Sequence, residues 1–351
     1  MGLFLGGLGI YLFIGVPIAL ALGMASFTYL IVSGNMSMMM IFPQRMLGSV
    51  NQFVLLTIPL FLLAGNLMNA GGITHRILAF ANACVGHRKG GLSLVNVVAS
   101  MFFGGVTGAA AADTSALGSV LIPGMKRAGY PIEYAAGLTA VSSVIGSIIP
   151  PSIIMVLYGV LTGTSIAQLF IAGIIPGILV GISLLIYAAW VAHKNDYPVA
   201  ERMPMAARVR AFFEALPVLL LPVIILGGIL LGVFTPTESA AVAVIYAVIL
   251  GVVYRTLKLS ALLYALSSTA VMTAGIMLIV AMASIVQFVL SFERIPAQVA
   301  ALMLGLSDNW IVLVLLVVLF LLILGMFLEP IAAMIISLPV LFEVSQVIGM
   351  D

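Results

Sequence analysis

The side chains best suited to bind an ion or a substrate lie in one apolar stretch, residues 102–126 (FFGGVTGAAAADTSALGSVLIPGMK). Gly104 and Gly108 flank Thr107, and an acid, Asp113, follows them. Glycines at this density make a continuous helix costly, and backbone groups released from a helix cannot stay unpaired in hydrocarbon. The pattern therefore predicts a broken membrane helix whose gap binds a ligand.

A gap at Thr107 would offer a hydroxyl group and several free carbonyl oxygens. Unwound carbonyls of this kind coordinate Na⁺ in secondary transporters, so we expect a monovalent cation here. The alternative is that the glycines serve only the close packing of helices. Asp113 has two interpretations as well: it is an ion ligand, or it caps the second half of the broken helix.

A second interrupted segment repeats this pattern in residues 142–159 (SSVIGSIIPPSIIMVLYG). Ser143 and Gly146 precede the adjacent prolines Pro150 and Pro151, which end a helix. Two such interruptions, each beside hydroxyl groups, make packing alone a weaker explanation for either.

Three further polar side chains lie inside apolar segments: Asn66, Glu238 and Glu329. Asn66 either belongs to a binding site, or its side-chain amide forms a hydrogen bond between helices. Glu238, in the sequence TPTE, fits the start of a helix better than an ion site, because Pro and Glu are both favoured there. Glu329 directly precedes Pro330, and an interrupted helix and an ion site explain it equally well.

Composition identifies a membrane protein. Of 351 residues, 64% are hydrophobic and 7% are charged, and the mean hydropathy is +1.32. A formal net charge of +2 excludes a nucleic-acid surface, and one cysteine excludes an internal disulfide. The three histidines show no ligand spacing, and the sequence contains no nucleotide-binding or hydrolase motif. We therefore expect no enzyme and no ATP hydrolysis, which leaves an ion gradient as the energy source.

The apolar segments that must hold these groups follow in order. Residues 2–32 predict one long span, retained in the protein and kinked at Pro17, and the Met-rich residues 36–46 predict an interfacial helix. Residues 52–69 and 73–85 form a re-entrant hairpin or a pair of tilted helices. Further apolar segments cover residues 92–125, 132–160, 167–192, 215–234, 237–254, 259–292, 297–306 and 311–327, and a final broken segment covers 325–351. The basic excess in the loop 193–214 predicts that this loop is cytoplasmic.

The two halves of the chain echo each other. Each contains a short or split apolar pair and then a broken span, with Leu-Ile-Pro in the first and Ser-Leu-Pro in the second. Corresponding interruptions in two halves indicate an inverted-repeat transporter with its site between the repeats. We expect four parts: an N-terminal scaffold span and interfacial helix, a first transport repeat, scaffold spans with the connecting loop, and a second transport repeat, in residues 1–50, 51–165, 166–258 and 259–351. No span matching residues 132–160 follows the second broken segment, so we expect this repeat to be incomplete.

Several motifs in order resemble the large membrane (permease) subunit of tripartite ATP-independent periplasmic (TRAP) transporters. The resemblance runs from the first span to the end of the chain. It is carried by TIPLFLLAGNLMNAGGIT, FFGGVTGAAAADTSALGSVLIPGMKRAGY, SSVIGSIIPPSIIMVLYG, FTPTESAAVAVIYA and GMFLEPIAA, in residues 57–74, 102–130, 142–159, 234–247 and 325–333.

This resemblance implies an all-α polytopic protein of the bacterial inner membrane, with an elevator fold of two re-entrant hairpins and two broken helices. It implies Na⁺-driven import of an organic anion, usually a carboxylate. The implied partners are a small four-helix membrane subunit and a periplasmic binding protein, with Na⁺ as the co-transported ion and no organic cofactor.

The resemblance also assigns residues. A first Na⁺ site would use the break from Gly104 to Gly108, including Thr107, and the first hairpin from Pro59 to Asn66. A second Na⁺ site would use the break at Gly325, although its remaining ligands in the family belong to a later Pro-Pro segment that this sequence lacks. Two other functions stay open: a Na⁺/dicarboxylate symporter that needs no binding protein, and a membrane scaffold without transport.

Overall fold

The computed structural model describes residues 2–306 and 309–348, and all regular elements in these residues are helices. The chain divides into two compact units, residues 53–270 and residues 1–52 with 271–351. The first unit holds α4 (Thr57–Ala70), α5 (Ile73–Val85), α6 (Gly91–Thr107), α7 (Ala110–Arg127), α8 (Ile132–Ser143), α9 (Ile153–Thr162), α10 (Ile166–Lys194), α11 (Met205–Leu230) and α12 (Pro236–Val253). The second holds α1 (Gly2–Phe13), α2 (Ile18–Val32), α3 (Phe42–Val50), α14 (Ile295–Leu306), α15 (Trp310–Phe327) and α16 (Pro330–Ile348), while α13 (Leu259–Phe292) belongs to both. The four-part division expected from the sequence stays a prediction.

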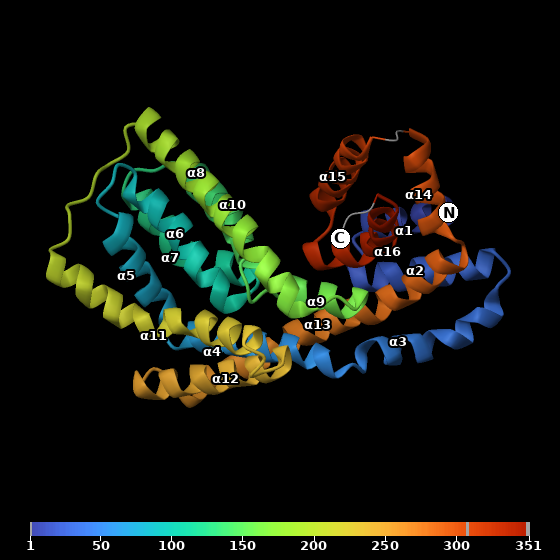
Figure 1. Ribbon diagram of the computed structural model, residues 1–351, viewed down its shortest axis with the longest axis horizontal. Helices are drawn as coiled ribbons and strands as arrows, with labels where there is room; N and C mark the ends of the chain where they lie inside the picture. The colour runs from blue at the N-terminus through green and yellow to red at the C-terminus, as the bar shows by residue number, and fades with distance from the viewer. Residues whose placement is uncertain (1, 307–308, 349–351) are drawn as a thin grey trace. The chain divides into compact units, whose positions relative to one another are not determined.

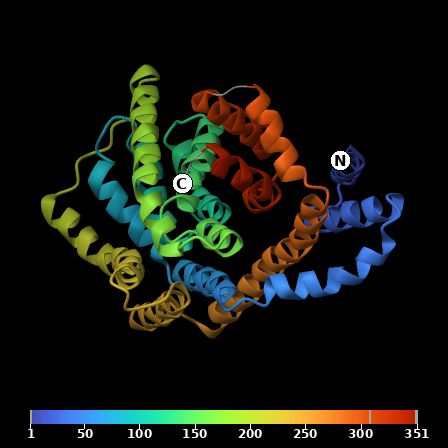
Figure 2. The same cartoon turned by 45° about the vertical axis from the view of Figure 1, so that its right-hand side comes forward.

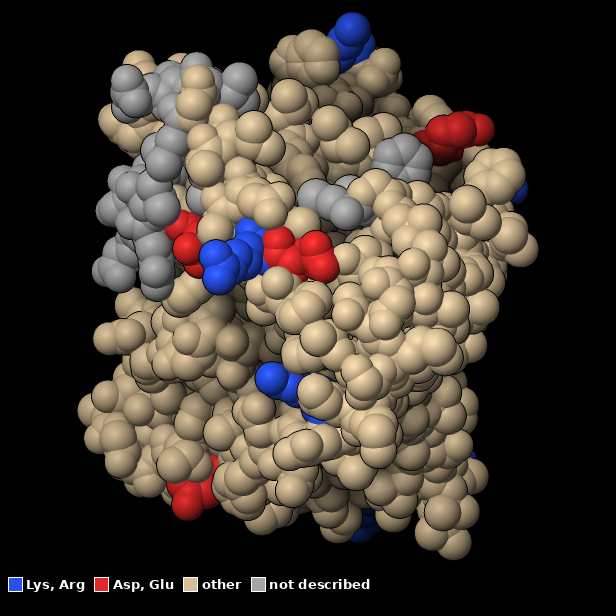
Figure 3. Space-filling view, turned by 90° about the vertical axis from the view of Figure 1, so that its right-hand side faces the viewer, with Lys and Arg blue, Asp and Glu red and all other residues tan. Residues whose placement is uncertain are grey.

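The surface of these helices is apolar. Five helical segments within the described residues are long and apolar enough to cross a membrane. On α10, outward-facing Ile175, Leu179 and Ile186 are each at least 60% exposed. Figure 3 shows a face on which only a few charged side chains interrupt uncharged ones. Such an apolar surface is favourable in contact with lipid and unfavourable in contact with water. The prediction of a polytopic membrane protein is therefore confirmed.

The first apolar segment is two helices, not one kinked span. The chain reverses between α1 and α2, where Gly15 adopts a φ of +86°. The Tyr11 hydroxyl then lies 2.7 Å from the Thr28 hydroxyl across the pair. Gly15 tolerates this backbone conformation, and Pro17 disfavours helix at the preceding residue, so together they turn the chain instead of bending it.

The segment with the glycine break also folds differently from expectation. In a broken but continuous helix, Asn96 and Met125 would lie about 43 Å apart, at 1.5 Å per residue. Instead the Asn96 amide lies 3.8 Å from the Met125 sulfur, because α7 returns alongside α6. The interruption was predicted correctly, but its direction was wrong: α6 and α7 form an antiparallel hairpin (Figure 1).

A buried polar network joins α6 to α8. The Asn96 amide donates to the Thr139 hydroxyl at 2.7 Å, and the Ser142 hydroxyl donates to the Asn96 side-chain oxygen at 3.2 Å. The Ser100 hydroxyl donates to Ser142 at 3.0 Å. These pairings place α8 parallel to α6, and α10 packs against α6 (Figures 1 and 2). The network fixes which faces of α6 and α8 meet, because each of these buried groups needs its partner.

The second predicted interruption is confirmed. Helix α8 passes into a short 3₁₀ turn, Val144–Ser147, and ends before Pro150 and Pro151. Helix α9 then begins with Ser152 as its N-cap, and the Ser152 hydroxyl accepts a hydrogen bond from the backbone N–H of Met155 at 3.4 Å. A cap of this type starts a new helix after prolines have ended the previous one.

The pair α4 and α5 corresponds to the segment for which hairpin and tilted helices both remained open. Helix α4 packs along α12 and also contacts α6, and α5 packs against α11 and α6. The Thr57 and Thr237 hydroxyls lie 2.9 Å apart between α4 and α12. Because both helices also contact α6, the choice between the hairpin and the tilted pair stays a prediction.

Candidate functional site

The α6–α7 turn rests on the turn that contains Pro150 and Pro151. Gly108 ends α6 with a φ of +63°, and its carbonyl oxygen accepts a hydrogen bond from the Ile153 N–H at 3.3 Å. A side chain at Gly108 would place its Cβ 2.6 Å from the Pro151 carbonyl oxygen. Gly108 is therefore required twice, for its backbone conformation and for this close approach.

Asp113 lies fully buried at this junction, with 0% exposure. The Thr107 hydroxyl donates a hydrogen bond to Asp113 Oδ1. Asp113 Oδ2 has no hydrogen-bond partner among the described residues. A buried carboxyl group with a free oxygen is costly unless a proton or a cation satisfies it. This orphan oxygen is the strongest sign of a ligand in the hairpin.

The alternative role for Asp113, as a cap of α7, is wrong. Ala109 is the N-cap residue, with φ −140° and ψ 119°, and no side chain bonds to the first N–H groups of α7. The Asp113 carboxylate points back to Thr107 instead, and Asp113 N donates to the Ala109 carbonyl at 3.1 Å.

Close packing through glycine is present beside the carboxylate. A Cβ on Gly104 would lie 2.5 Å from Gly146 Cα, and a Cβ on Gly146 would collide with Asp113 Oδ2. A Cβ on Gly65 of α4 would lie 3.2 Å from Thr107 Cα. Packing thus accounts for Gly104, Gly146 and Gly65, but it leaves the free Asp113 oxygen unexplained. Gly65 was not singled out in the sequence, although it directly precedes Asn66 in a quoted motif.

The predicted site residues of this unit divide into those at the junction and those apart from it; Gly325 and Glu329 lie in the other unit. Pro150 and Pro151 join Gly104, Thr107, Gly108, Asp113 and Gly146 at the junction. Ser143, Asn66 and Pro59 lie apart: the Ser143 hydroxyl donates to the Thr139 carbonyl at 2.7 Å, Asn66 donates to the Thr269 hydroxyl at 2.9 Å, and Pro59 lies in the first turn of α4. The interhelical alternative for Asn66 is thereby confirmed.

Gly325 and Glu329 belong to the other unit. The break there falls at Leu328 and Glu329, between α15 and α16, and Gly325 remains helical. The Glu329 carboxylate accepts a hydrogen bond from the Ala332 N–H at 3.4 Å. Glu329 therefore lies at the start of α16. Of its two interpretations, an interrupted helix or an ion site, this position supports the interrupted helix.

Electrostatically, the junction combines one carboxylate with two helix N-termini. Helices α7 and α9 both begin within it, as the hydrogen bond from Ile153 to Gly108 shows. Helix N-termini carry partial positive charge and favour anions, whereas free carbonyl and carboxylate oxygens favour hard cations. No group of three His, Cys, Asp or Glu side chains in residues 2–306 and 309–348 could hold a metal ion. A cation here would therefore use mostly neutral oxygens.

Comparison with known proteins decides the family. The profile of the DctM component of tripartite ATP-independent periplasmic transporters matches residues 5–351. The chain belongs to this family of large permeases. It is 41% identical to the large permease of the sialic acid TRAP transporter of Vibrio cholerae, over all of this chain and 82% of that protein. It is 42% identical to the C4-dicarboxylate large permease of Pseudomonas aeruginosa, over 85% of this chain and 70% of that one. The 2,3-diketo-L-gulonate large permease of Escherichia coli is 37% identical, with coverage of 100% and 82%.

The family prediction is thus confirmed over essentially the whole chain. Membership makes this permease a multi-pass protein of the bacterial inner membrane, in agreement with its apolar surface. The predicted binding residues themselves stay predictions, because no comparison assigns a role to any of them.

Proposed function

We propose that this permease imports an organic anion by coupling it to Na⁺, without a catalytic step. The anion is a carboxylate delivered by a periplasmic binding protein, and a small four-helix membrane subunit completes the transporter. The single observation that carries the Na⁺ site is the buried Asp113 carboxylate, with one oxygen bonded to Thr107 and the other free. Na⁺ would satisfy that oxygen, aided by backbone carbonyls at the break.

The substrate class rests on the relatives and on the helix ends. The three relatives named above are permeases for sialic acid, C4-dicarboxylates and diketogulonate, all of which carry carboxylate groups. The uncapped N-terminus of α7 would offer N–H groups to such a group, and Na⁺ nearby would strengthen the field. The identity of the anion would then depend on side chains outside this shared junction.

An elevator movement is supported by the way the hairpin is built. Helices α6, α7 and α8 pack around one buried polar network and can move as a body. The other unit has a similar pair, α15 and α16, also separated by two residues. We propose that the α6–α7 pair is a re-entrant hairpin of the moving domain and that the α15–α16 pair is its counterpart.

The first experiment measures thermal stability of the purified transporter in NaCl and in equimolar KCl or choline chloride. We expect stabilisation specific to Na⁺, of about 2.7 kcal/mol when Na⁺ is at 100 times its Kd. Thr107→Val should abolish the Na⁺-specific part. Thr114→Val is the matched control, because the Thr114 hydroxyl donates to its own helix at the Ala110 carbonyl. Equal stability in all three salts would leave close packing as the only role of this junction.

A further inference from the structure

A groove lies where the end of α10 meets the α5–α6 connection. It has a volume of about 560 Å³. Its long wall is aliphatic and includes Ile182, Leu185 and Ile186 of α10 and Leu94 of α6, and its end holds Arg88 and His193. Apolar and basic side chains therefore share one concave surface, with the charges gathered at one end.

The charges at this end are predominantly positive. Lys89 also lines the groove and is paired with Asp196, whose pKa is held below its usual value by that ammonium group. The pKa of nearby His87 is lowered by lost hydration and by the positive charges of Arg202, Arg208 and Arg88. Asp196 thus neutralises Lys89, while the charge of Arg88 remains in excess.

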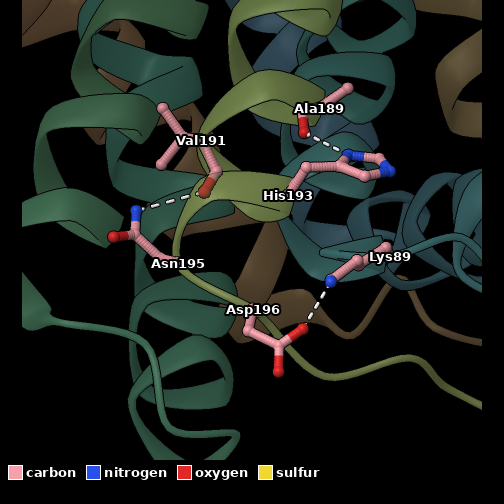
Figure 4. Close-up of polar contacts among 6 residues, drawn as sticks. All are labelled: Lys89, Ala189, Val191, His193, Asn195 and Asp196. Carbon is pink, nitrogen blue, oxygen red and sulfur yellow. Dashed lines mark hydrogen bonds and ion pairs between the residues drawn. The ribbon is translucent and has the colours of Figure 1, made fainter.

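The orientation of His193 adds a polar group at the same end. Its Nδ1 lies 2.7 Å from the Ala189 carbonyl oxygen, so Nδ1 carries the proton that is donated there, and Nε2 of the neutral ring is an acceptor. Figure 4 shows His193 at the end of α10 and, on the chain that follows, Asp196 facing Lys89. The groove therefore offers the Arg88 guanidinium to an anion, and His193 Nε2 as an acceptor to a hydroxyl group.

Aromatic side chains mark the level of this end in the membrane. Tyr187 and Trp190 of α10 are 50% and 57% exposed, and their ring centroids lie 6.2 Å apart. The Lys194 ammonium lies 5.1 Å from the Trp190 ring centroid. Exposed Tyr and Trp gather at the membrane–water interface, so the basic end lies at the headgroup level and Ile182 lies in hydrocarbon.

We propose that this groove binds an anionic phospholipid, with its phosphate at Arg88 and an acyl chain along Ile182, Leu185 and Ile186. The distance from His193 to Ile182 along the helix is about 16 Å at 1.5 Å per residue, which most of an acyl chain can fill. A basic pocket beside membrane helices on the cytoplasmic side is the kind of site that holds such headgroups. Soluble anions lack the apolar part that the long wall would contact.

The test measures binding of phosphatidylglycerol to the purified transporter in micelles, by native mass spectrometry and thermal stability. Phosphatidylcholine and inorganic phosphate serve as comparison probes. We expect phosphatidylglycerol to bind and stabilise more than either. Arg88→Gln should weaken its binding about fivefold, the factor that corresponds to ~1 kcal/mol for one basic side chain near a membrane surface.

Two further variants keep the proposal testable if Arg88→Gln does not fold. Asp196→Asn frees Lys89 and should strengthen binding of phosphatidylglycerol. Ala189→Phe fills the groove and should weaken binding without a change of charge. Arg210→Gln is the control, because Arg210 is exposed at the same face but pairs with Glu214 and does not line the groove.

Three results would overturn the proposal. These are equal binding of phosphatidylglycerol and phosphatidylcholine, an Asp196→Asn effect no larger than that of Arg210→Gln, or unchanged binding in Ala189→Phe. Displacement of the lipid by the small membrane subunit would assign the groove to that protein instead.

Discussion

Thr107 and Asp113 are six residues apart, yet their side chains are hydrogen-bonded at the turn between two helices. In one continuous helix, such a pair would be separated by about 9 Å along the axis. The residue types predicted that this position is special, because a threonine between glycines and a buried acid are unusual in apolar sequence. They did not predict that the two would bind each other, because that depends on the reversal at Gly108.

Glu238 shows a residue whose role the sequence did predict. Its carboxylate accepts from the Thr235 N–H at 2.8 Å, and the Thr235 hydroxyl accepts from the Glu238 N–H at 3.3 Å. This capping box starts α12, so Glu238→Ala should cost about 1 kcal/mol of stability. Thermal unfolding in detergent measures the loss.

The double variant with Thr235→Ala supplies the control for this prediction. Because the two side chains also contact each other at 2.8 Å, it should lose less than the sum of the single losses. An additive result, or no loss for Glu238→Ala, would show that α12 does not depend on the box.

At the scale of elements, the sequence predicted correctly where helices are interrupted, but not whether the chain continues or reverses after each interruption. Gly108, Pro150 and Leu328 lie at or beside breaks in the expected segments. Gly15 and Gly108, however, both reverse the chain where a kink or a gap was expected. A hydrophobic pattern cannot distinguish these outcomes, because a hairpin and a broken span bury similar residues and satisfy their backbone groups equally. Contacts between distant residues, such as Asn96 with Met125, decide the matter.

The close crossing of α6 with the segment after α8 gives a prediction about packing. Gly146→Ala would drive a methyl group against Asp113 and the Gly104 backbone, so it should cost roughly 1–3 kcal/mol. It should also weaken the Na⁺-specific stabilisation, because it displaces the carboxylate. Both effects can be measured by thermal unfolding with and without Na⁺.

Gly137→Ala is the matched control for this crossing. Gly137 lies within α8, and a Cβ there would meet nothing within 4 Å. That variant should be neutral or slightly stabilising, since alanine is the better helix former. Equal destabilisation by both variants would mean that the loss has no connection with the crossing.

At the scale of the molecule, charge is distributed unequally along the first unit. The end of α5, the end of α7 and the connection after α10 lie together, as the ion pair between Lys89 and Asp196 and the 4.3 Å approach of the Tyr130 and Tyr197 rings show. Eight of the 13 Lys and Arg residues lie there: Arg88, Lys89, Lys126, Arg127, Lys194, Arg202, Arg208 and Arg210. Positive charge in short loops favours the cytoplasm, so this face should be cytoplasmic.

Cysteine labelling tests this orientation. In a Cys84→Ala background, Glu201→Cys should react with a membrane-impermeant maleimide only from the cytoplasmic side. Ser165→Cys, before the start of the 29-residue helix α10, should react only from the opposite side, because that helix is about 43 Å long. Labelling of both from one side would contradict the assignment.

The reversal at Gly108 also has a consequence for biogenesis. Both outer ends of the α6–α7 pair lie at the basic face, so with that face in the cytoplasm, as predicted above, the pair can enter the bilayer without export of a polar loop. Asp113 is the one charged residue between Gly91 and Met125. Its hydrogen-bond partner, Thr107, belongs to the same hairpin. The nascent chain can therefore shield this acid before α8 and the later helices are synthesised.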